Sequence, residues 1–300
     1  MRSFIAAALS LTLLVSGTHI AQAQTSPLQI RNQAMEAHTS RNYARAEELW
    51  RELLSELPND ARALSGLGFA LLLQGDEAEA QDTFQQVFSI DPGLGYLTLG
   101  VGLALLERFA EAEDAYVNAI AHEPEAADIH YNLGVAISNQ DRPSEAEAAY
   151  QEAIRLNPNY VDAYYNLGSI LSDQSRYEEA EAAYQSAIEI EPSADIYNNL
   201  GVLLNKQKRY AEGETAYRAA IQLNPSLVDS HQGLGNALIH QEQYAEAEAA
   251  YKNAIARDAN FADAHYALGV ALFAQGREQE ADTSFQEAIR LNPEFASVFE

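Results

Sequence analysis

Apolar and polar residues follow the period of an amphipathic helix along most of the chain. From Tyr177 to Ile188, apolar residues recur at helical spacing, and glutamates fill the positions between them. The stretch from Asp162 to Ser172 has the same period, with Leu167 and Leu171 on one face. Because polar residues 172–176 separate the two stretches, the pattern predicts two helices joined by a short turn.

This helix pair recurs at steps of 32 to 34 residues. One column of the repeat is glycine: Gly68, Gly100, Gly134, Gly168, Gly201, Gly235 and Gly269. Sixteen residues further on, every repeat has an aromatic residue: Phe84, Tyr116, Tyr150, Tyr184, Tyr217, Tyr251 and Phe285. The pattern extends back once, through Ala34, Ala46 and Trp50, which makes eight repeats. Their predicted bounds are about 27–60, 61–92, 93–126, 127–160, 161–193, 194–227, 228–261 and 262–295.

Each column has a packing role. Gly168 and Ala180 lie where the two helices of a repeat approach closely, and Tyr184 fills the wedge between them. Pro192 lacks an N–H group, so it ends the second helix. A single helix pair cannot bury its own apolar stripe, and stacking of the repeats completes the core.

The pattern resembles the tetratricopeptide repeat, a helix–turn–helix unit of 34 residues. Residues 164–168 and 180–192 match that family closely, and the resemblance covers about residues 27–295. It implies an all-α fold, a right-handed α-solenoid of eight repeats. It also implies that the first helices line a concave groove that receives an extended peptide or a helix.

The departures from the repeat pattern are concentrated at a few positions. Repeat 1 has Ala34 in the glycine column, repeat 6 has Gly213 in the alanine column, and repeat 7 lacks the terminal proline at Ala259. Four glycines crowd the first helix of repeat 3, between Gly93 and Gly102. A glycine inside a helix costs about 1 kcal/mol relative to alanine, so four of them in one helix require an explanation. The segment is expected to be a decayed repeat, a hinge or a close backbone contact.

The chain is strongly acidic, with 18 Lys+Arg against 44 Asp+Glu and a net charge of −26. Nucleic acids and anionic membranes attract basic surfaces, so neither is expected as the main partner. The absence of cysteine excludes disulfides and cysteine-ligated metal centres.

The first 23 residues have the features of a secretory signal peptide. A basic Arg2 precedes a mostly apolar run from Phe4 to Val15, and small residues follow at Ala21 and Ala23. We expect cleavage between Ala23 and Gln24, which leaves the repeats in residues 24–300. The alternative is an N-terminal membrane anchor, but the apolar run is short for a bilayer that needs about 20 residues. The protein is therefore predicted to be exported, to a periplasm or equivalent lumen or to the medium, with no membrane span.

No catalytic or metal-binding pattern is found, and no enzyme activity or cofactor is expected. His130, His231 and His265 share one column, four residues before the glycine. Equivalent positions in stacked helix pairs lie about two interhelix spacings of 8–10 Å apart, too far for a shared zinc ion with ligands at about 2 Å. A packing role is the better interpretation.

The candidate binding residues form three columns on the first helices. Aspartates lie six residues before the glycine, at Asp128, Asp162, Asp195, Asp229 and Asp263. Asparagines lie two before it, at Asn132, Asn166 and Asn199, and Tyr131, Tyr165, Asn198, Gln232 and Tyr266 lie between them. Residues four apart share a helix face, so these side chains predict an acidic, amide-lined groove with aromatic patches. Amides can donate to and accept from a peptide backbone, and aspartates favour a basic partner.

The aspartates have a second explanation. A carboxylate in the first turn of a helix is stabilised by the helix dipole by about 0.3–1 kcal/mol, whether or not it binds a partner. The carboxylates elsewhere are expected on exposed faces, where they keep the protein in solution.

The sequence thus predicts an exported, non-enzymatic scaffold, adaptor or assembly factor that binds a protein or peptide. The alternatives are an accessory subunit of an enzyme complex, handling glycans, secretion or photosynthetic assembly, and a polymer- or sugar-binding module. Since little chain follows Pro293 to cap the last repeat, that repeat is also predicted to offer an apolar face for self-association.

Overall fold

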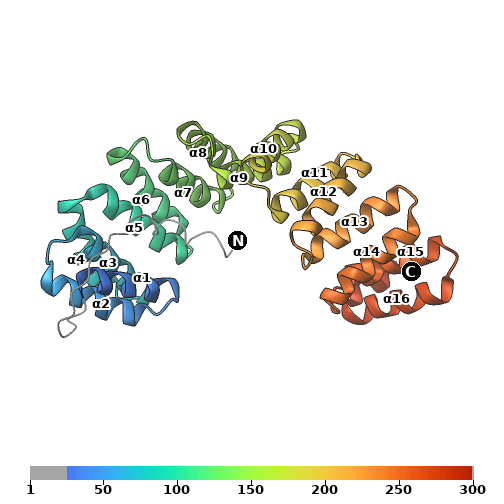
Figure 1. Ribbon diagram of the computed structural model, residues 1–300, viewed down its shortest axis with the longest axis horizontal. Coiled ribbons are helices and arrows are strands. Elements are labelled where there is room, and N and C mark those ends of the chain that lie inside the picture. The colour runs from blue at the N-terminus through green and yellow to red at the C-terminus, as the bar shows by residue number, and fades with distance from the viewer. Residues whose placement is uncertain (1–25, 299–300) are drawn as a thin grey trace. The chain divides into compact units, whose positions relative to one another are not determined.

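The computed structural model describes residues 26–298, and within them it is entirely helical, as the repeat pattern predicts (Figure 1). Each repeat contributes two antiparallel helices. The first helices are α1 (Pro27–Thr39), α3 (Ala61–Gln74), α5 (Pro92–Leu105), α7 (Ala127–Ser138), α9 (Val161–Asp173), α11 (Ala194–Lys206), α13 (Val228–His240) and α15 (Ala262–Ala274). The second helices are α2 (Tyr43–Glu56), α4 (Glu77–Ile90), α6 (Phe109–His122), α8 (Pro143–Leu156), α10 (Tyr177–Ile190), α12 (Tyr210–Leu223), α14 (Tyr244–Arg257) and α16 (Glu278–Leu291). A short 3-10 helix, η2 (Pro293–Val298), follows. The predicted signal peptide and its cleavage site at Ala23 and Gln24 lie outside the described residues.

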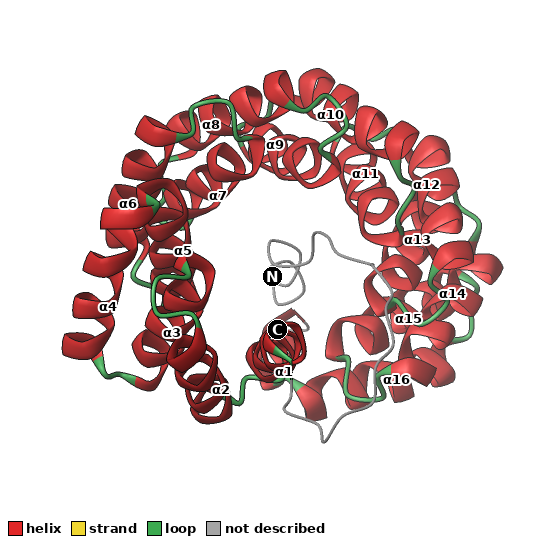
Figure 2. Ribbon diagram, turned by 60° about the vertical axis from the view of Figure 1, so that its left-hand side comes forward, coloured by secondary structure: helices red, strands yellow, loops and turns green. Residues whose placement is uncertain are grey.

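The helices group into two compact units, one up to Pro158 and one from Asn159. The first unit holds α1 to α8 and the second holds α9 to α16. In each unit, successive odd-numbered helices contact one another, and the even-numbered helices form a separate layer (Figure 2). The odd-numbered helices lie closer to one another than the even-numbered helices do, so each unit is concave on the side of the odd-numbered helices.

Local sequence explains where several helices begin. Ser26 and Gln29 form a capping box before α1, with Pro27 as the first helical residue. Asp60 accepts a hydrogen bond from the Ala63 backbone N–H at 2.9 Å, and Asp91 and Ser193 cap α5 and α11 in the same way. Most second helices have instead glutamates in the first turn, where they complement the helix dipole.

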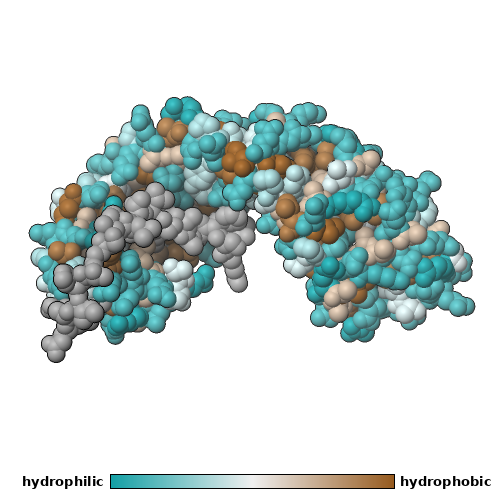
Figure 3. Space-filling model, viewed as in Figure 1, coloured by the Kyte–Doolittle hydropathy of each residue, from teal (hydrophilic) through white to brown (hydrophobic). Residues whose placement is uncertain are grey.

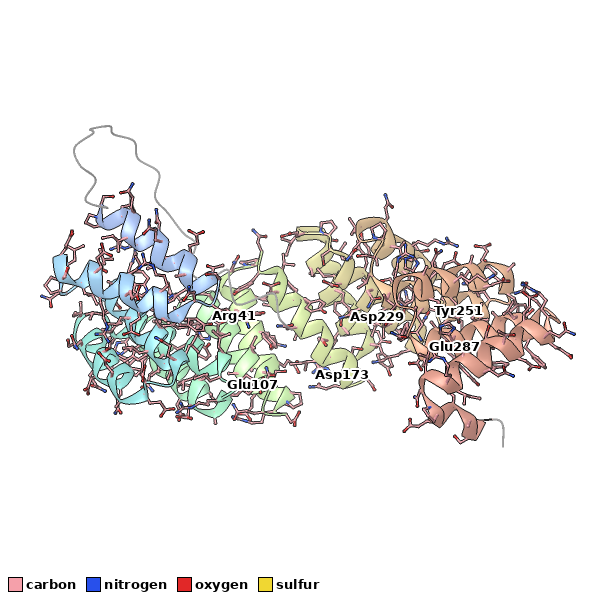
Figure 4. All side chains as sticks on the ribbon, turned by 90° about the horizontal axis from the view of Figure 1, so that it is seen from below. Arg41, Glu107, Asp173, Asp229, Tyr251 and Glu287 are labelled. Carbon is pink, nitrogen blue, oxygen red and sulfur yellow. The ribbon has the colours of Figure 1, made fainter. Side chains whose placement is uncertain are left out.

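The turn inside each repeat requires one residue in the left-handed conformation. Glycine takes this position only at Gly75 and Gly276, with φ of 89° and 75°. In the other repeats a residue with a side chain takes it, with φ of 57° to 62°, among them Arg41 and Glu107, labelled in Figure 4. A side chain in this conformation costs free energy that glycine avoids.

Glu107→Gly is therefore expected to stabilise the first unit by about 0.5–1 kcal/mol, since the gain in the turn exceeds glycine's extra freedom in the unfolded chain. Gly75→Ala, at the same turn position, should destabilise the unit. Urea unfolding of both variants measures the change. Destabilisation by Glu107→Gly would show that the turn is not strained.

The glycine and aromatic columns form the centre of each repeat. Tyr184 and Tyr251 are buried, and each packs its ring on the glycine of its own repeat. A β-carbon on Gly168 would lie 2.7 Å from Cε1 of Tyr184, and one on Gly235 would lie 2.4 Å from Cε1 of Tyr251. Real β-carbons do not approach so closely, so glycine is required for the ring to fill the wedge.

The glycine-rich segment of repeat 3 is an unbroken helix, α5. A β-carbon on Gly95 would meet Phe88 at 2.7 Å, one on Gly100 would meet Tyr116 at 2.6 Å, and one on Gly102 would meet Leu72 at 2.8 Å. Close packing of α5 on its neighbours therefore accounts for these glycines. The division between the two compact units falls at Pro158, not at this segment.

A ladder of arginines joins the second helices of successive repeats. Arg142 donates to Glu113 of the preceding repeat and to Glu145 of its own, at 2.6 Å each. Arg209 bridges Glu181 and Glu212 in the same way, and Arg277 bridges Glu248 and Glu280. The expectation that the carboxylates outside the groove lie on exposed faces is wrong for Glu113, Glu181 and Glu248, whose side chains are only 12% to 19% exposed. They lie between repeats because the arginine pairs with them there.

Candidate functional site: the concave face of the second unit

The predicted groove residues are divided between the two units. Asp128, Tyr131 and Asn132 lie on α7 in the first unit. The remaining candidates lie on α9, α11, α13 and α15 of the second unit, all of them odd-numbered helices. The second unit is therefore the larger part of the site.

The aspartates occupy the first turns of their helices, as the repeat pattern predicts. Asp128, Asp195, Asp229 and Asp263 are exposed. Asp162 is half-buried, and burial together with the nearby negative charge of Glu191 raises the pKa of its carboxyl group. Asp162 is thus a poorer attachment point for a basic partner than the other four.

Three of the predicted polar side chains form a hydrogen-bonded chain across the second unit. Asn199 donates from Nδ2 to the Tyr165 hydroxyl at 2.8 Å, which ties α11 to α9. Asn198 donates to Oδ1 of Asn199 at 3.4 Å and accepts from the Ser230 hydroxyl at 2.8 Å, which ties α11 to α13. Burial and the charge of Asp195 raise the pKa of the Tyr165 hydroxyl, so this group stays protonated at neutral pH. The chain holds α9, α11 and α13 in register.

A pocket of about 600 Å³ lies between α11 and α13, with α12 beneath it. Three predicted groove residues line it: Asn198, Asp229 and Gln232. Asn205, Lys206, Asn236 and His240 also line it, together with Tyr210 and Tyr217 of α12. The structure therefore brings three predicted groove residues together with Asn205, Lys206, Asn236 and His240, which the predicted groove columns do not include.

Two departures from the repeat pattern shape this pocket. Asn205 reaches across to α13 and donates to the Gly233 carbonyl at 3.4 Å. Gly213, which replaces the usual alanine, leaves room for it, because a β-carbon there would lie 2.5 Å from Oδ1 of Asn205. Gly233 replaces the asparagine of the three preceding repeats, and a β-carbon there would meet the Tyr217 ring at 2.4 Å. The pocket depends on both glycines.

Two tyrosines that the sequence assigns to the groove, Tyr131 and Tyr266, do not form an exposed aromatic patch. Tyr131 is only 8% exposed and packs on Tyr150, so it belongs to the core of the first unit. Tyr266 is stacked by Phe295 of η2, with ring centroids 4.9 Å apart. The end of the chain thus covers a ring that the sequence alone assigns to the groove.

The histidine column has a packing role. Nε2 of His130, His231 and His265 each lies 2.9–3.1 Å from the carbonyl oxygen six residues earlier. Each ring therefore closes the loop before its own helix. Within residues 26–298, no group of three or more potential ligands is arranged to hold a metal ion.

Comparison with known families now identifies the class of protein. Models of the tetratricopeptide repeat match residues 37–97, 97–161, 138–195, 165–227 and 233–294. The chain belongs to the tetratricopeptide repeat family. Proteins of this family mediate protein–protein interactions and are generally non-catalytic.

Solved structures share the fold at low sequence identity. YrrB, described as a tetratricopeptide repeat protein with an unusual peptide-binding site, is 24% identical, with a TM-score of 0.54 over 60% of this chain and 94% of its own. PilF of Pseudomonas aeruginosa is 21% identical, with a TM-score of 0.59 over 68% of this chain and 93% of its own. MamA of Desulfovibrio magneticus RS-1 is 20% identical, with a TM-score of 0.53 over 56% and 96%. A search of curated proteins found no matching relative.

In Figure 3 the visible face of each unit is mostly hydrophilic. Among the described residues, no helix combines the length and apolar character needed to cross a membrane.

Proposed function

We propose that this protein is an exported, non-enzymatic scaffold or assembly factor that binds a protein or peptide segment on the concave face of its second unit. The observation that carries the proposal is the polar pocket between α11 and α13, lined by Asn198, Asp229 and Gln232. A peptide backbone needs donors and acceptors of this kind, and a chain built of repeats presents them in a row. Export is supported by the basic, apolar and small-residue segments of residues 1–23.

The partner segment is proposed to be basic. Asp195, Asp229 and Asp263 are exposed in the first turns of α11, α13 and α15, which are successive first helices of the second unit. A row of carboxylates attracts lysine and arginine side chains and speeds their encounter. The tyrosines of the Tyr184 column are buried, so they offer no ring for stacking on sugars, which disfavours the polymer-binding alternative.

Reversing the charge of Asp195, Asp229 and Asp263 to lysine is expected to weaken partner binding at least tenfold and to flatten its dependence on salt, because each substitution removes an attractive charge and adds a repulsive one. Partners are captured on the immobilised wild-type chain from the exported compartment, identified by mass spectrometry, and titrated against both proteins. The matched control reverses Glu178, Glu189 and Asp282, which are exposed on second helices. Equal loss in the control, or no loss in the groove variant, would contradict the assignment.

Self-association through the last repeat is part of the same proposal. Phe273 on α15 is 62% exposed. The equivalent position one repeat earlier, Ile239, is partly buried and packs against the core of the second unit. The exposed ring therefore supports an apolar end face, and light scattering at increasing concentration tests it.

A further inference from the structure

The pocket between α11 and α13 has an acidic side chain at one end and basic side chains at the other. Asp229 lies in the first turn of α13, and His240 is the last residue of the same helix. Asp229 and His240 are 11 positions apart, which corresponds to about 16 Å along the helix at 1.5 Å per residue. Lys206, the last residue of α11, lines the pocket as well.

The contacts between the two helices show which ends are neighbours. Asn198 of α11 bonds to Ser230 of α13, and Asn205 of α11 bonds to Gly233. Both numbers increase together, so α11 and α13 run parallel. Lys206 at the end of α11 and His240 at the end of α13 therefore belong to one end of the pocket, and Asp229 belongs to the other (Figure 4 labels Asp229).

We propose that this pocket receives an extended peptide segment with a basic and an acidic side chain about four residues apart. The basic side chain pairs with Asp229, and the acidic one lies between Lys206 and His240. An extended chain advances about 3.3 Å per residue, so four residues span about 13 Å, and the side chains cover the remainder of the 16 Å. The inference rests on the proposed function, because it names the segment that the concave face binds.

Lys206 can meet a ligand carboxylate by exchanging its contacts with α9. Nζ of Lys206 lies 3.4 Å from the Ser172 hydroxyl and 3.9 Å from a carboxylate oxygen of Asp173, whose side chain is 79% exposed. An exposed pair at this distance is worth at most about 1 kcal/mol, so a carboxylate in the pocket competes with it. The His240 ring is stacked on Tyr210, with centroids 4.2 Å apart, which fixes its position at the rim.

The walls between the two ends are pre-formed. Asn198 is held by Ser230, Asn205 by the Gly233 carbonyl, and Asn236 by the Tyr251 hydroxyl at 2.8 Å. Side chains that are already ordered lose little entropy on binding, which favours capture of a short segment. Gly213 of repeat 6 is the only glycine in its sequence column, where the other repeats have alanine, so the sequence marks this junction as distinct.

Labelled heptapeptides with neutral ends test the inference by fluorescence anisotropy on the full chain. The first has lysine at position two and aspartate at position six, with glycine and serine elsewhere. Two others replace the lysine by glutamine or the aspartate by asparagine. Asp229→Asn is expected to weaken the first peptide about two- to fivefold and to leave the glutamine peptide unchanged. Lys206→Gln is expected to weaken the first peptide similarly and to leave the asparagine peptide unchanged.

Matched controls separate the pocket from general charge. Asp263→Asn removes an aspartate that belongs to the same column as Asp229 but does not line the pocket. Lys208→Gln removes a lysine that lies two residues beyond the end of α11. Neither should change the affinity for the first peptide by more than the error. The inference would be overturned if the pocket variants and the control variants had equal effects. It would also be overturned by equal affinity for a peptide whose two charges are adjacent, or by no binding at millimolar peptide concentration. If partner capture still depends on Asp195, Asp229 and Asp263, the proposed function stands without it.

Discussion

Lowering the pH from 6.5 to 4 is expected to destabilise the first unit by about 3 kcal/mol through His38 alone. Burial lowers the pKa of the His38 imidazole from 6.5 to about 4, against a smaller opposing effect of a hydrogen bond with the Gly66 backbone. The side chain is 7% exposed and is packed by Tyr43, Trp50 and Phe69. Trp50 donates from Nε1 to Nε2 of His38 at 3.2 Å, so the ring must be neutral at that nitrogen.

The sign follows from proton binding in the two states. Below pH 6.5 the unfolded chain takes up a proton on this ring, while the folded unit does not until about pH 4. The stability contributed by the neutral His38 ring is therefore fully present above pH 6.5. It is lost as the pH falls from 6.5 to about 4, and no further loss from this group occurs below that. The fall of the His38 pKa from 6.5 to about 4 corresponds to about 3 kcal/mol.

Trp50 provides the measurement, because it is the only tryptophan and lies in the first unit. Urea unfolding is followed by its fluorescence at pH 7, 5.5 and 4.5. His38→Gln keeps a hydrogen-bond acceptor but does not titrate, so its stability should depend less on pH than that of the wild type. His122→Gln, at an exposed histidine, is the control and should keep the wild-type slope. An unchanged slope in His38→Gln would show that carboxylates alone cause the acid sensitivity.

Tyr251→Ala is expected to destabilise the second unit by about 3–5 kcal/mol. The ring is 1% exposed and fills the wedge between α13 and α14, where Gly235 leaves room for it. Removing a large buried aromatic ring loses its transfer free energy and leaves a cavity that the helices cannot fill. Far-UV circular dichroism during urea unfolding measures the loss.

Two further variants separate the ring from its hydroxyl. Tyr251→Phe keeps the ring but removes the hydrogen bond to Asn236, and should cost about 1 kcal/mol. Asn253→Ala, at an exposed position of the same helix, should stay within about 0.5 kcal/mol of the wild type. If Tyr251→Phe cost as much as Tyr251→Ala, the hydroxyl and not the packing would hold the repeat together.

The acidic charge has more than one role. Arg142, Arg209 and Arg277 each neutralise two glutamates at a junction between repeats, so part of the charge belongs to the stacking of the second helices. Gln243 occupies the same column in repeat 7, and there Arg218 of α12 pairs with Glu246 of α14 instead. The exposed aspartates of the first helices are the part of the charge that the proposed function assigns to a partner.

The candidate site was predictable in part. The column rule places Asp229 and Gln232 on one face of a helix, because residues three or four apart are neighbours there. It does not place Asn205, Lys206 and His240 beside them, since these lie in other columns and reach the pocket only when α11 and α13 pack. The signals that could have found them are the unusual glycines Gly213 and Gly233, which the repeat pattern marks but does not explain.

The sequence by itself determined the repeat, its helices and its core. A helical period and a fixed aromatic column are local properties, and they require glycine at Gly168 and Gly235 wherever Tyr184 and Tyr251 are to be buried. Only the tertiary structure decided that Tyr131 is in the core, that Phe295 covers Tyr266, and that Glu181 lies between repeats. The physical reason is that each of these depends on a distance between residues far apart in the chain, which repeat spacing does not set.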